Sequence, residues 1–358
     1  MARWLYFLIP VGGVALLLRI IGFAPEVVFL TSVVGIIPLA TLIGVSTEDL
    51  AHKIGPKWGG LLTATMGNAA ELLIGFMALQ QGLIALVKAS ITGSIVGNLL
   101  LILGTGLLLG GWRHGRLHFD PREAGHHSSM MLIALAALLL PTVFAPFVAD
   151  RRGLPEVSDG FAVILLLVYA AYLFFSTRPE GQIVAAEQIR GPEEHDRKPW
   201  TARIALGVLV AATVGTGVLA EALVGTVETV SHTAGLSQFF VGVIVVPLVG
   251  NVAEHLSAVQ LAAKGKVDIS LAIAAGSSTQ IALFVAPVLV LAGIVLGQPM
   301  DLLFHPLEIV ALGVAASLFA FVSLDGESNW FEAVQLLALY LMAGIAFFFF
   351  LPSAPPGH

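Results

Sequence analysis

The 358-residue sequence contains no cysteine and few charged residues. Without cysteine, disulfides, thiolate metal sites and cysteine nucleophiles are all excluded. Asp, Glu, Lys and Arg together make up 11% of the residues, whereas a soluble domain carries about 25%, and 57% of the residues are hydrophobic. This composition excludes a soluble fold.

Apolar runs long enough to cross a bilayer occur along the whole chain. In lipid only helices and closed barrels satisfy every backbone polar group, and these runs are too long for barrel strands. The sequence therefore predicts an all-α polytopic membrane protein with about eleven transmembrane helices. The expected spans are residues 4–22, 26–48, 58–80, 84–110, 124–148, 159–176, 201–225, 238–263, 267–297, 303–323 and 331–351.

The basic residues are distributed unevenly between the two ends of these spans. When each Lys and Arg is assigned to the nearer end of a predicted span, thirteen fall on the N-terminal side of the membrane and four on the other side. Together they make the 17 basic residues of the chain. Because cytoplasmic loops are enriched in Lys and Arg, we expect the N-terminus in the cytoplasm and, with an odd number of spans, the C-terminus outside. In a prokaryote this would be the plasma (inner) membrane.

A short motif occurs twice in the chain. Gly-Asn-Ala-Ala-Glu at residues 67–71 recurs as Gly-Asn-Val-Ala-Glu at residues 250–254, an offset of 183 (250 minus 67). Gly-Ser at residues 93–94 recurs at residues 276–277 with the same offset. Two matches in one register indicate an internal duplication. Because each copy would contain five helices, the second copy enters the membrane from the opposite face, which predicts two inverted repeats.

The duplication predicts a division of the chain. Inverted repeats are typical of transporters, in which the substrate site lies between the halves near the membrane midplane, although a duplicated structural bundle is an alternative. The expected parts are an N-terminal transmembrane helix at 1–25, a first five-helix repeat at 26–177, a cytoplasmic linker at 178–200, a second five-helix repeat at 201–351 and a C-terminal tail at 352–358.

Each motif carries a glutamate deep within an apolar span. Glu71 lies 13 residues after Trp58, which places it about 20 Å along a helix that crosses a hydrocarbon core of about 30 Å. Glu254 reaches a similar depth from the other face. Ionisable side chains at this depth are costly and are functional candidates by default. Two bare carboxylates would repel each other, so we expect the pair to be neutralised either by protons or by one divalent cation.

Further polar side chains lie near the two glutamates in the predicted helices. Asn68 and Asn251 precede the glutamates by three residues and share their helix faces, so each is either a cation ligand or an interhelical hydrogen-bonding group. Gly67 and Gly250 allow either local unwinding or close helix approach. The predicted metal ligands are Glu71, Glu254, Asn68 and Asn251, the predicted proton carriers are Glu71 and Glu254, and the supporting polar residues are Asn98, Ser94, Ser277 and Gln280.

These oxygen ligands favour Ca²⁺, which prefers carboxylate, amide and backbone oxygens. The ligand types do not exclude Mn²⁺ as the bound cation. Four carboxylates at the expected span ends either attract cations to the entrances or are merely solvated. They are Glu48, Asp49, Glu221 and Glu228.

The motifs at 67–71 and 250–255, together with residues 93–98 and 276–280, resemble the Ca²⁺/H⁺ antiporter (cation/proton exchanger, CAX) family of the cation/Ca²⁺ exchanger superfamily. The resemblance covers the chain from the second span onward. It implies an eleven-helix antiporter that exchanges Ca²⁺ for H⁺, with Glu71 and Glu254 as the ion and proton site. Sodium/calcium exchangers of the superfamily carry serine, threonine and proline around their glutamates, and neither motif here does.

The resemblance implies Ca²⁺ and H⁺ as substrates in a lipid bilayer, with no cofactor and no nucleic-acid partner, and leaves the oligomeric state open. The family's acidic linker is not matched, because residues 178–200 hold five acidic and four basic residues, and a surface helix is expected near residues 182–189. The alternatives are a Na⁺-coupled or Mn²⁺-preferring exchanger, an intramembrane enzyme, or a passive channel. No catalytic motif supports the enzyme.

Overall fold

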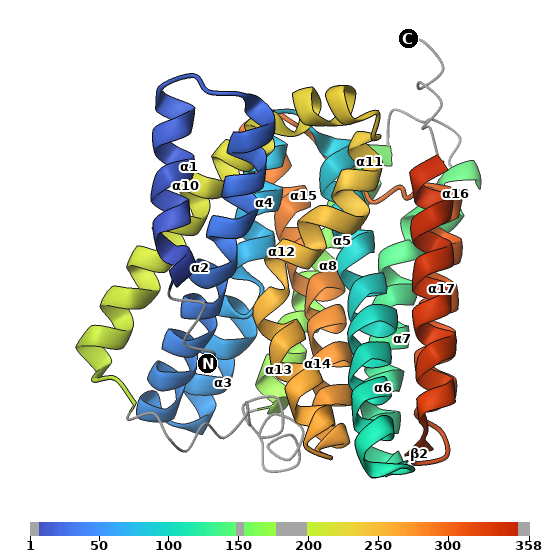
Figure 1. The fold of residues 1–358 in the computed structure, drawn as a ribbon. Coiled ribbons are helices and arrows are strands. Elements are labelled where there is room, and N and C mark those ends of the chain that lie inside the picture. Colours follow the sequence, from blue (N-terminus) through green and yellow to red (C-terminus); the bar gives the residue numbers. More distant parts are fainter. Residues whose placement is uncertain (1–6, 148–153, 177–198, 350–358) are drawn as a thin grey trace.

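The computed structural model describes residues 7–147, 154–176 and 199–349, and these ranges are almost entirely helical (Figure 1). The linker residues up to 198, with the surface helix expected there, and the C-terminal tail lie outside the described residues. Within the described ranges, seven helices are long and apolar enough to cross a membrane. They are α2 (Pro25–Ile54), α5–η2–α6 (Ile84–Val96, Gly97–Ile102, Leu103–His114), α7–η3 (Pro121–Phe144, Ala145–Phe147), α8 (Leu154–Ser176), α10 (Ala202–Ala234), α14–η6–α15 (Val267–Gln280, Ile281–Val285, Ala286–Leu296) and α17 (Trp330–Phe349).

Two further candidate spans are each made of helices that meet at a bend. In the first, α3 (Pro56–Met66) meets α4 (Ala69–Gln80) at 44°. In the second, a run of α11, η5 and α12 meets α13 at 65°, with bounds Gln238–Phe240, Val241–Val245, Val246–Gly250 and Val252–Ala263. Two shorter apolar helices complete the set, α1 (Ile9–Ile20) and α16 (Pro306–Val322).

The bends lie at the two asparagines of the repeated motif. Asn68 has φ −100° and ψ 24°, and Asn251 has φ −89° and ψ 7°, so neither continues the α-helix. Local unwinding, one of the two uses expected for the preceding glycines, is therefore present in both motifs. Beyond the breaks, α4 and α13 run toward opposite ends of the molecule (Figure 1).

The elements after each break begin at matching positions. α4 and α13 start at residues 69 and 252, α5 and α14 at 84 and 267, and α6 and α15 at 103 and 286, which are differences of 183 in each case. The π-helical segments η2 and η6 fall at the same place in each series. Segments of this type are frequent at functional sites.

Two helices continue beyond the ends that the hydropathy pattern predicts. α2 ends at Ile54 rather than at residue 48, and α10 ends at Ala234 rather than at residue 225. An apolar run ends where the hydrocarbon ends, but a helix continues until a residue leaves the right-handed conformation, as Gly55 (φ 86°) and Gly235 (φ 66°) do here. The predicted entry carboxylates Glu48, Asp49, Glu221 and Glu228 therefore lie within helices and not at their ends.

The helices α1, α2 and α10 pack together along one side of the molecule (Figure 1). Gly12 and Gly35 allow α1 and α2 to approach closely, since a methyl group added at Gly35 would lie 2.7 Å from the Gly12 Cα. Arg19 of α1 forms an ion pair of 2.6 Å with Glu221 of α10. The first helix is thus attached to helices from both halves of the chain.

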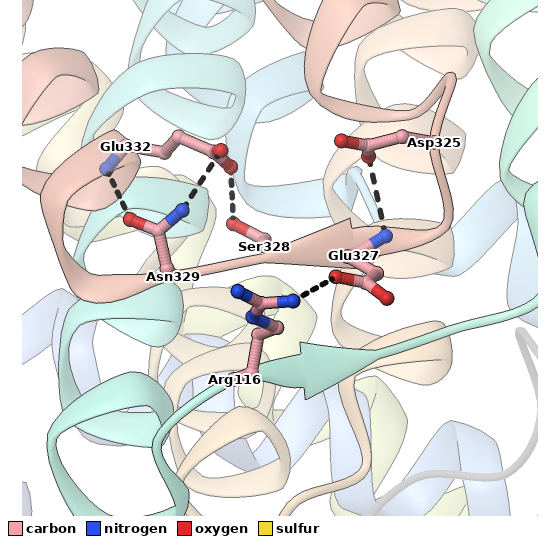
Figure 2. A pocket seen from close by; sticks show the side chains of 6 residues that line it. All are labelled: Arg116, Asp325, Glu327, Ser328, Asn329 and Glu332. Carbon is pink, nitrogen blue, oxygen red and sulfur yellow. Dashed lines mark hydrogen bonds and ion pairs between the residues drawn. The ribbon is translucent and has the colours of Figure 1, made fainter.

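A two-residue antiparallel ladder joins β1 (Leu117–His118) to β2 (Glu327–Ser328). A cavity of about 200 Å³ lies beside it, and its polar groups bond to one another (Figure 2). Arg116 Nη1 lies 3.2 Å from Glu327 Oε2, and Ser328 Oγ donates a 2.9 Å hydrogen bond to Glu332. None of the predicted site residues lines this cavity, and its bonds join the α6–α7 and α16–α17 connections.

Candidate functional site

The two broken helices bring the motif glutamates together. Glu71 lies in the first turn of α4 and Glu254 in the first turn of α13. A methyl group added at Gly250 would lie 3.2 Å from Glu71 Oε1, and one added at Gly67 would lie 3.5 Å from Glu254 Oε1. Each carboxylate therefore packs against the glycine of the other motif, and the two are close enough to interact electrostatically. Both glycines thus also allow the carboxylate of the other motif to approach the backbone closely.

Within the described part of the chain, three buried oxygen atoms around this pair have no hydrogen-bond partner. They are Glu71 Oε2, Glu254 Oε2 and Asn251 Oδ1. Buried polar atoms are bonded in the great majority of cases, so a cluster of unpartnered acceptors needs an explanation. Two carboxylates and an amide oxygen are the hard ligands that Ca²⁺ takes, and the carboxylates can instead hold protons. The chemistry of the residues fits a site that exchanges the two.

The supporting polar residues form a network that crosses between the halves of the chain. Asn68 Nδ2 donates to Gln280 Oε1 at 2.6 Å, and Ser277 Oγ donates to Asn68 Oδ1 at 3.3 Å. Asn98 Nδ2 in turn donates to Ser277 Oγ at 3.1 Å. The structure therefore brings Asn68, Asn98, Ser277 and Gln280 together as expected.

The second asparagine has a different environment. Asn251 Nδ2 donates to Ser94 Oγ at 3.0 Å and to Pro247 O at 3.1 Å, while its Oδ1 has no partner among residues 7–147, 154–176 and 199–349. In Asn68, by contrast, both polar atoms of the side chain are bonded. The two asparagines occupy equivalent motif positions, but only in Asn251 is the side-chain oxygen without a hydrogen bond among the described residues.

The exposure of the two motifs also differs. Ala69, Ala70 and Glu71 are buried, with Glu71 5% exposed, whereas residues 252–254 are all half-buried. Equivalent positions in two similar halves would be equally exposed in a symmetric arrangement. Residues 252–254 are thus more exposed than their counterparts, although the Glu254 Oε2 atom is itself buried.

Three of the four predicted entry carboxylates contact other side chains or backbone groups. Buried Asp49 accepts a 3.0 Å hydrogen bond from the Trp200 backbone N–H, which ties α2 to the start of the second half. Glu221 pairs with Arg19 as described above, and Glu48 lies 3.9 Å from His52 on the same helix. Glu228 is exposed on α10.

The sequence analysis did not single out Tyr169, which reaches the first broken helix. Its hydroxyl donates a 3.0 Å hydrogen bond to the backbone oxygen of Ala64, in the last turn of α3. The available signal was a tyrosine in the middle of an apolar span, because a buried phenol hydroxyl usually finds a partner.

Comparison with known proteins shows the family. The sequence pattern of the family described as sodium/calcium exchanger protein matches residues 26–178 and 204–349. The chain belongs to this family. The sodium/calcium exchanger family consists of membrane transporters, so the chain is a transporter and not an enzyme, and the resemblance to cation exchangers is confirmed.

Named relatives of this exchanger include proteins from bacteria and plants. It is 43% identical over 336 residues to a Ca²⁺/H⁺ antiporter of Aphanothece halophytica, with 90% of each chain covered. It is 40% identical over 349 residues to the Ca²⁺/H⁺ antiporter ChaA of Bacillus subtilis, with 96% of this chain and 99% of the relative covered. It is 37% identical over 357 residues to vacuolar cation/proton exchanger 1 of Arabidopsis thaliana, with 96% and 77% covered.

Solved structures share the fold of this exchanger family member. Native YfkE superposes with a TM-score of 0.84 at 37% identity, covering 97% of this chain and 100% of YfkE. The H⁺/Ca²⁺ exchanger CAX superposes with a TM-score of 0.69 at 16% identity, covering 96% and 91%, which shows the fold alone.

Proposed function

We propose that the protein exchanges Ca²⁺ for H⁺ across the membrane by alternating access, with Glu71 and Glu254 binding either the cation or protons. The observation that carries the proposal is the reciprocal packing of the two buried carboxylates, each against the glycine of the other motif and each with an unpartnered oxygen. The names of the relatives, which are Ca²⁺/H⁺ antiporters in bacteria, support the choice of ions.

In this mechanism the charge of the carboxylate pair controls the movement of the halves. Two bare carboxylates in a medium of low dielectric constant repel each other and are poorly solvated. Binding of one Ca²⁺, or of protons, removes that penalty. Rearrangement is then fast only when the site carries one substrate or the other, so transport in one direction is coupled to transport in the other.

The cation ligands that we propose are Glu71, Glu254 and the two motif asparagines, of which Asn251 offers a free oxygen. Asn98, Ser94, Ser277 and Gln280 hold the asparagines through the hydrogen bonds described above. Backbone oxygens at the two breaks and water would complete the 6–8 ligands that Ca²⁺ prefers. Of the entry carboxylates, Glu48 and Glu228 retain the proposed role of attracting cations.

We also propose the eleven-span topology. The seven long helices, the two bent pairs counted as one span each, and the two shorter helices α1 and α16 add up to eleven. The matched starting positions in the two halves support inverted repeats at 26–177 and 201–351, after a first helix that has no counterpart. The excess of basic residues supports a cytoplasmic N-terminus and a C-terminus outside.

Transport into liposomes tests the proposal. The purified protein is reconstituted, and uptake of labelled Ca²⁺ is driven separately by a pH gradient and by a Na⁺ gradient. We expect uptake with the pH gradient in the absence of Na⁺. Uptake that requires Na⁺ would replace the proposal by Na⁺-coupled exchange, and preferential Mn²⁺ uptake would replace Ca²⁺ as the substrate.

A further inference from the structure

Tyr169 contacts elements from both halves of the chain next to the cation site. It lies in the middle of α8 and is 4% exposed. Its hydroxyl bonds to Ala64 O of α3 at 3.0 Å, and its ring stacks on Phe284 of η6, with ring centroids 5.0 Å apart and an interplanar angle of 24°. α3 leads into Asn68, and η6 directly follows Gln280.

The hydroxyl occupies a position that a backbone donor fills in the other half. Ala64 and Pro247 are equivalent residues, because they differ by the repeat offset of 183 (247 minus 64). Pro247 O accepts the backbone N–H of Asn251 at 3.0 Å, which is the usual helical bond. In the first half, the matching bond from Asn68 N to Ala64 O is not made among the described residues, and Tyr169 supplies the donor instead.

The use of the Tyr169 hydroxyl in place of a backbone N–H donor affects the geometry of the break. A buried carbonyl needs a partner, and without the hydroxyl the nearest candidate donor is the Asn68 N–H. Forming that bond would extend α3 by a residue and rotate Asn68 relative to α14. The Asn68 to Gln280 hydrogen bond of 2.6 Å, which joins the halves at the site, depends on the present orientation.

We propose that Tyr169 is a positioning residue for the cation site. Its hydroxyl holds the first broken helix open at Ala64, and its ring fixes η6 through Phe284, so a single side chain sets how Asn68 and Gln280 meet. The proposal rests on the exchange function proposed above. Tyr169 does not contact the cation, and its effect passes through Asn68 and the adjacent Glu71.

Replacing the hydroxyl alone tests the proposal. Tyr169→Phe keeps the ring and its stacking on Phe284 but removes the donor to Ala64 O. We expect the KM for Ca²⁺ in liposome uptake to rise about five- to tenfold while the maximal rate changes less than about twofold, because binding geometry is altered and the ionisable pair is intact. Tyr340→Phe, at a half-buried tyrosine of α17, is the matched control and should leave both values unchanged.

Hydrogen exchange gives a second readout that does not depend on transport. In Tyr169→Phe we expect amide exchange at residues 63–72 to change, because the backbone bonds at the break rearrange, while residues 247–256 stay as in the wild type. Unchanged exchange together with an unchanged KM would overturn the proposal. A lower maximal rate and melting temperature with an unchanged KM would show a merely structural role. If the wild type fails to exchange Ca²⁺ for H⁺, the proposed function fails, and hydrogen exchange still decides whether Tyr169 positions the break.

Discussion

At the scale of single residues, the site is characterised by oxygens that the protein itself leaves unpaired. Glu71 Oε2, Glu254 Oε2 and Asn251 Oδ1 are all buried, and each would be costly if it stayed without a partner. The glutamates could be found from the sequence, because an ionisable residue deep in an apolar span stands out from its surroundings. The difference between Asn68 and Asn251 could not, because it depends on Gln280 and Ser94, which are distant in the chain.

Neutralising either glutamate should abolish exchange. We expect Glu71→Gln or Glu254→Gln to lower Ca²⁺ uptake about 100-fold or more. A glutamine amide neither binds and releases a proton near neutral pH nor carries the negative charge that the cation needs. Uptake driven by a pH gradient measures the effect, and membrane insertion should be normal. Glu48→Gln is the control and should impair uptake only modestly. Wild-type uptake in either site variant would remove that residue from the mechanism.

The two asparagines should respond differently to removal. Asn251→Ala deletes an oxygen that is free to bind the cation, so we expect the KM for Ca²⁺ to rise about tenfold. Asn68→Ala instead removes the donor to Gln280 Oε1 and the acceptor of the Ser277 hydroxyl, and we expect a loss of stability of about 1–3 kcal/mol. Uptake kinetics and thermal unfolding of the two variants, measured together, distinguish these outcomes. Identical behaviour of the two variants would show that both asparagines have the same role.

At the scale of helices, the two breaks determine where the site forms. Gly67 and Gly250 suggested unwinding or close approach from the sequence, and the structure has both. The hydrogen bond from Tyr169 to Ala64 beside the first break was not predictable, because it joins residues that are 105 positions apart in the chain. The ends of α2 and α10 were placed too early for a related reason, because hydropathy reports the lipid boundary and not the end of the helix.

A methyl group at either motif glycine tests the packing of the carboxylates. At Gly250 it would lie 3.2 Å from three atoms of Glu71, so the carboxylate must move. At Gly67 the opposite carboxylate oxygen would lie 3.5 Å away, in ordinary contact, and the tightest neighbour, at 3.0 Å, is the Thr63 backbone oxygen of the preceding helical turn and not a site carboxylate. We therefore expect Gly250→Ala to raise the KM for Ca²⁺ about tenfold and Gly67→Ala to raise it less. Uptake kinetics measure both, and a larger effect of Gly67→Ala would contradict the packing described here.

At the scale of the whole molecule, several elements of the first half of the chain recur in the second at a constant offset, but the two motifs differ at the site. The 183-residue offset of the motifs predicted the correspondence of the elements, and the starts of α4 to α6 and α13 to α15 follow it. The sequence did not indicate the difference in exposure between Glu71 and Glu254. Two nearly identical motifs carry no information on which of them is the more exposed in the folded protein.

The proposed inversion of the halves predicts the location of two equivalent positions. Gln81 and Lys264 differ by 183 and are both exposed, just after α4 and α13. Because the chain has no cysteine, Gln81→Cys and Lys264→Cys each introduce a single reactive thiol. In intact cells we expect an impermeant thiol reagent to label residue 81 from outside and residue 264 only after the membrane is permeabilised. Labelling of both from the same side would exclude inverted halves.

The central claim is that the same two carboxylates hold either the cation or protons. Simultaneous measurement of Ca²⁺ binding and proton release by the purified protein near neutral pH tests it most directly. We predict that a single Ca²⁺ binds per chain with release of about one to two protons, that lowering the pH weakens binding because protons compete, and that Glu254→Gln loses both binding and release. Ca²⁺ binding without proton release, or release that persists in Glu254→Gln, would contradict the account.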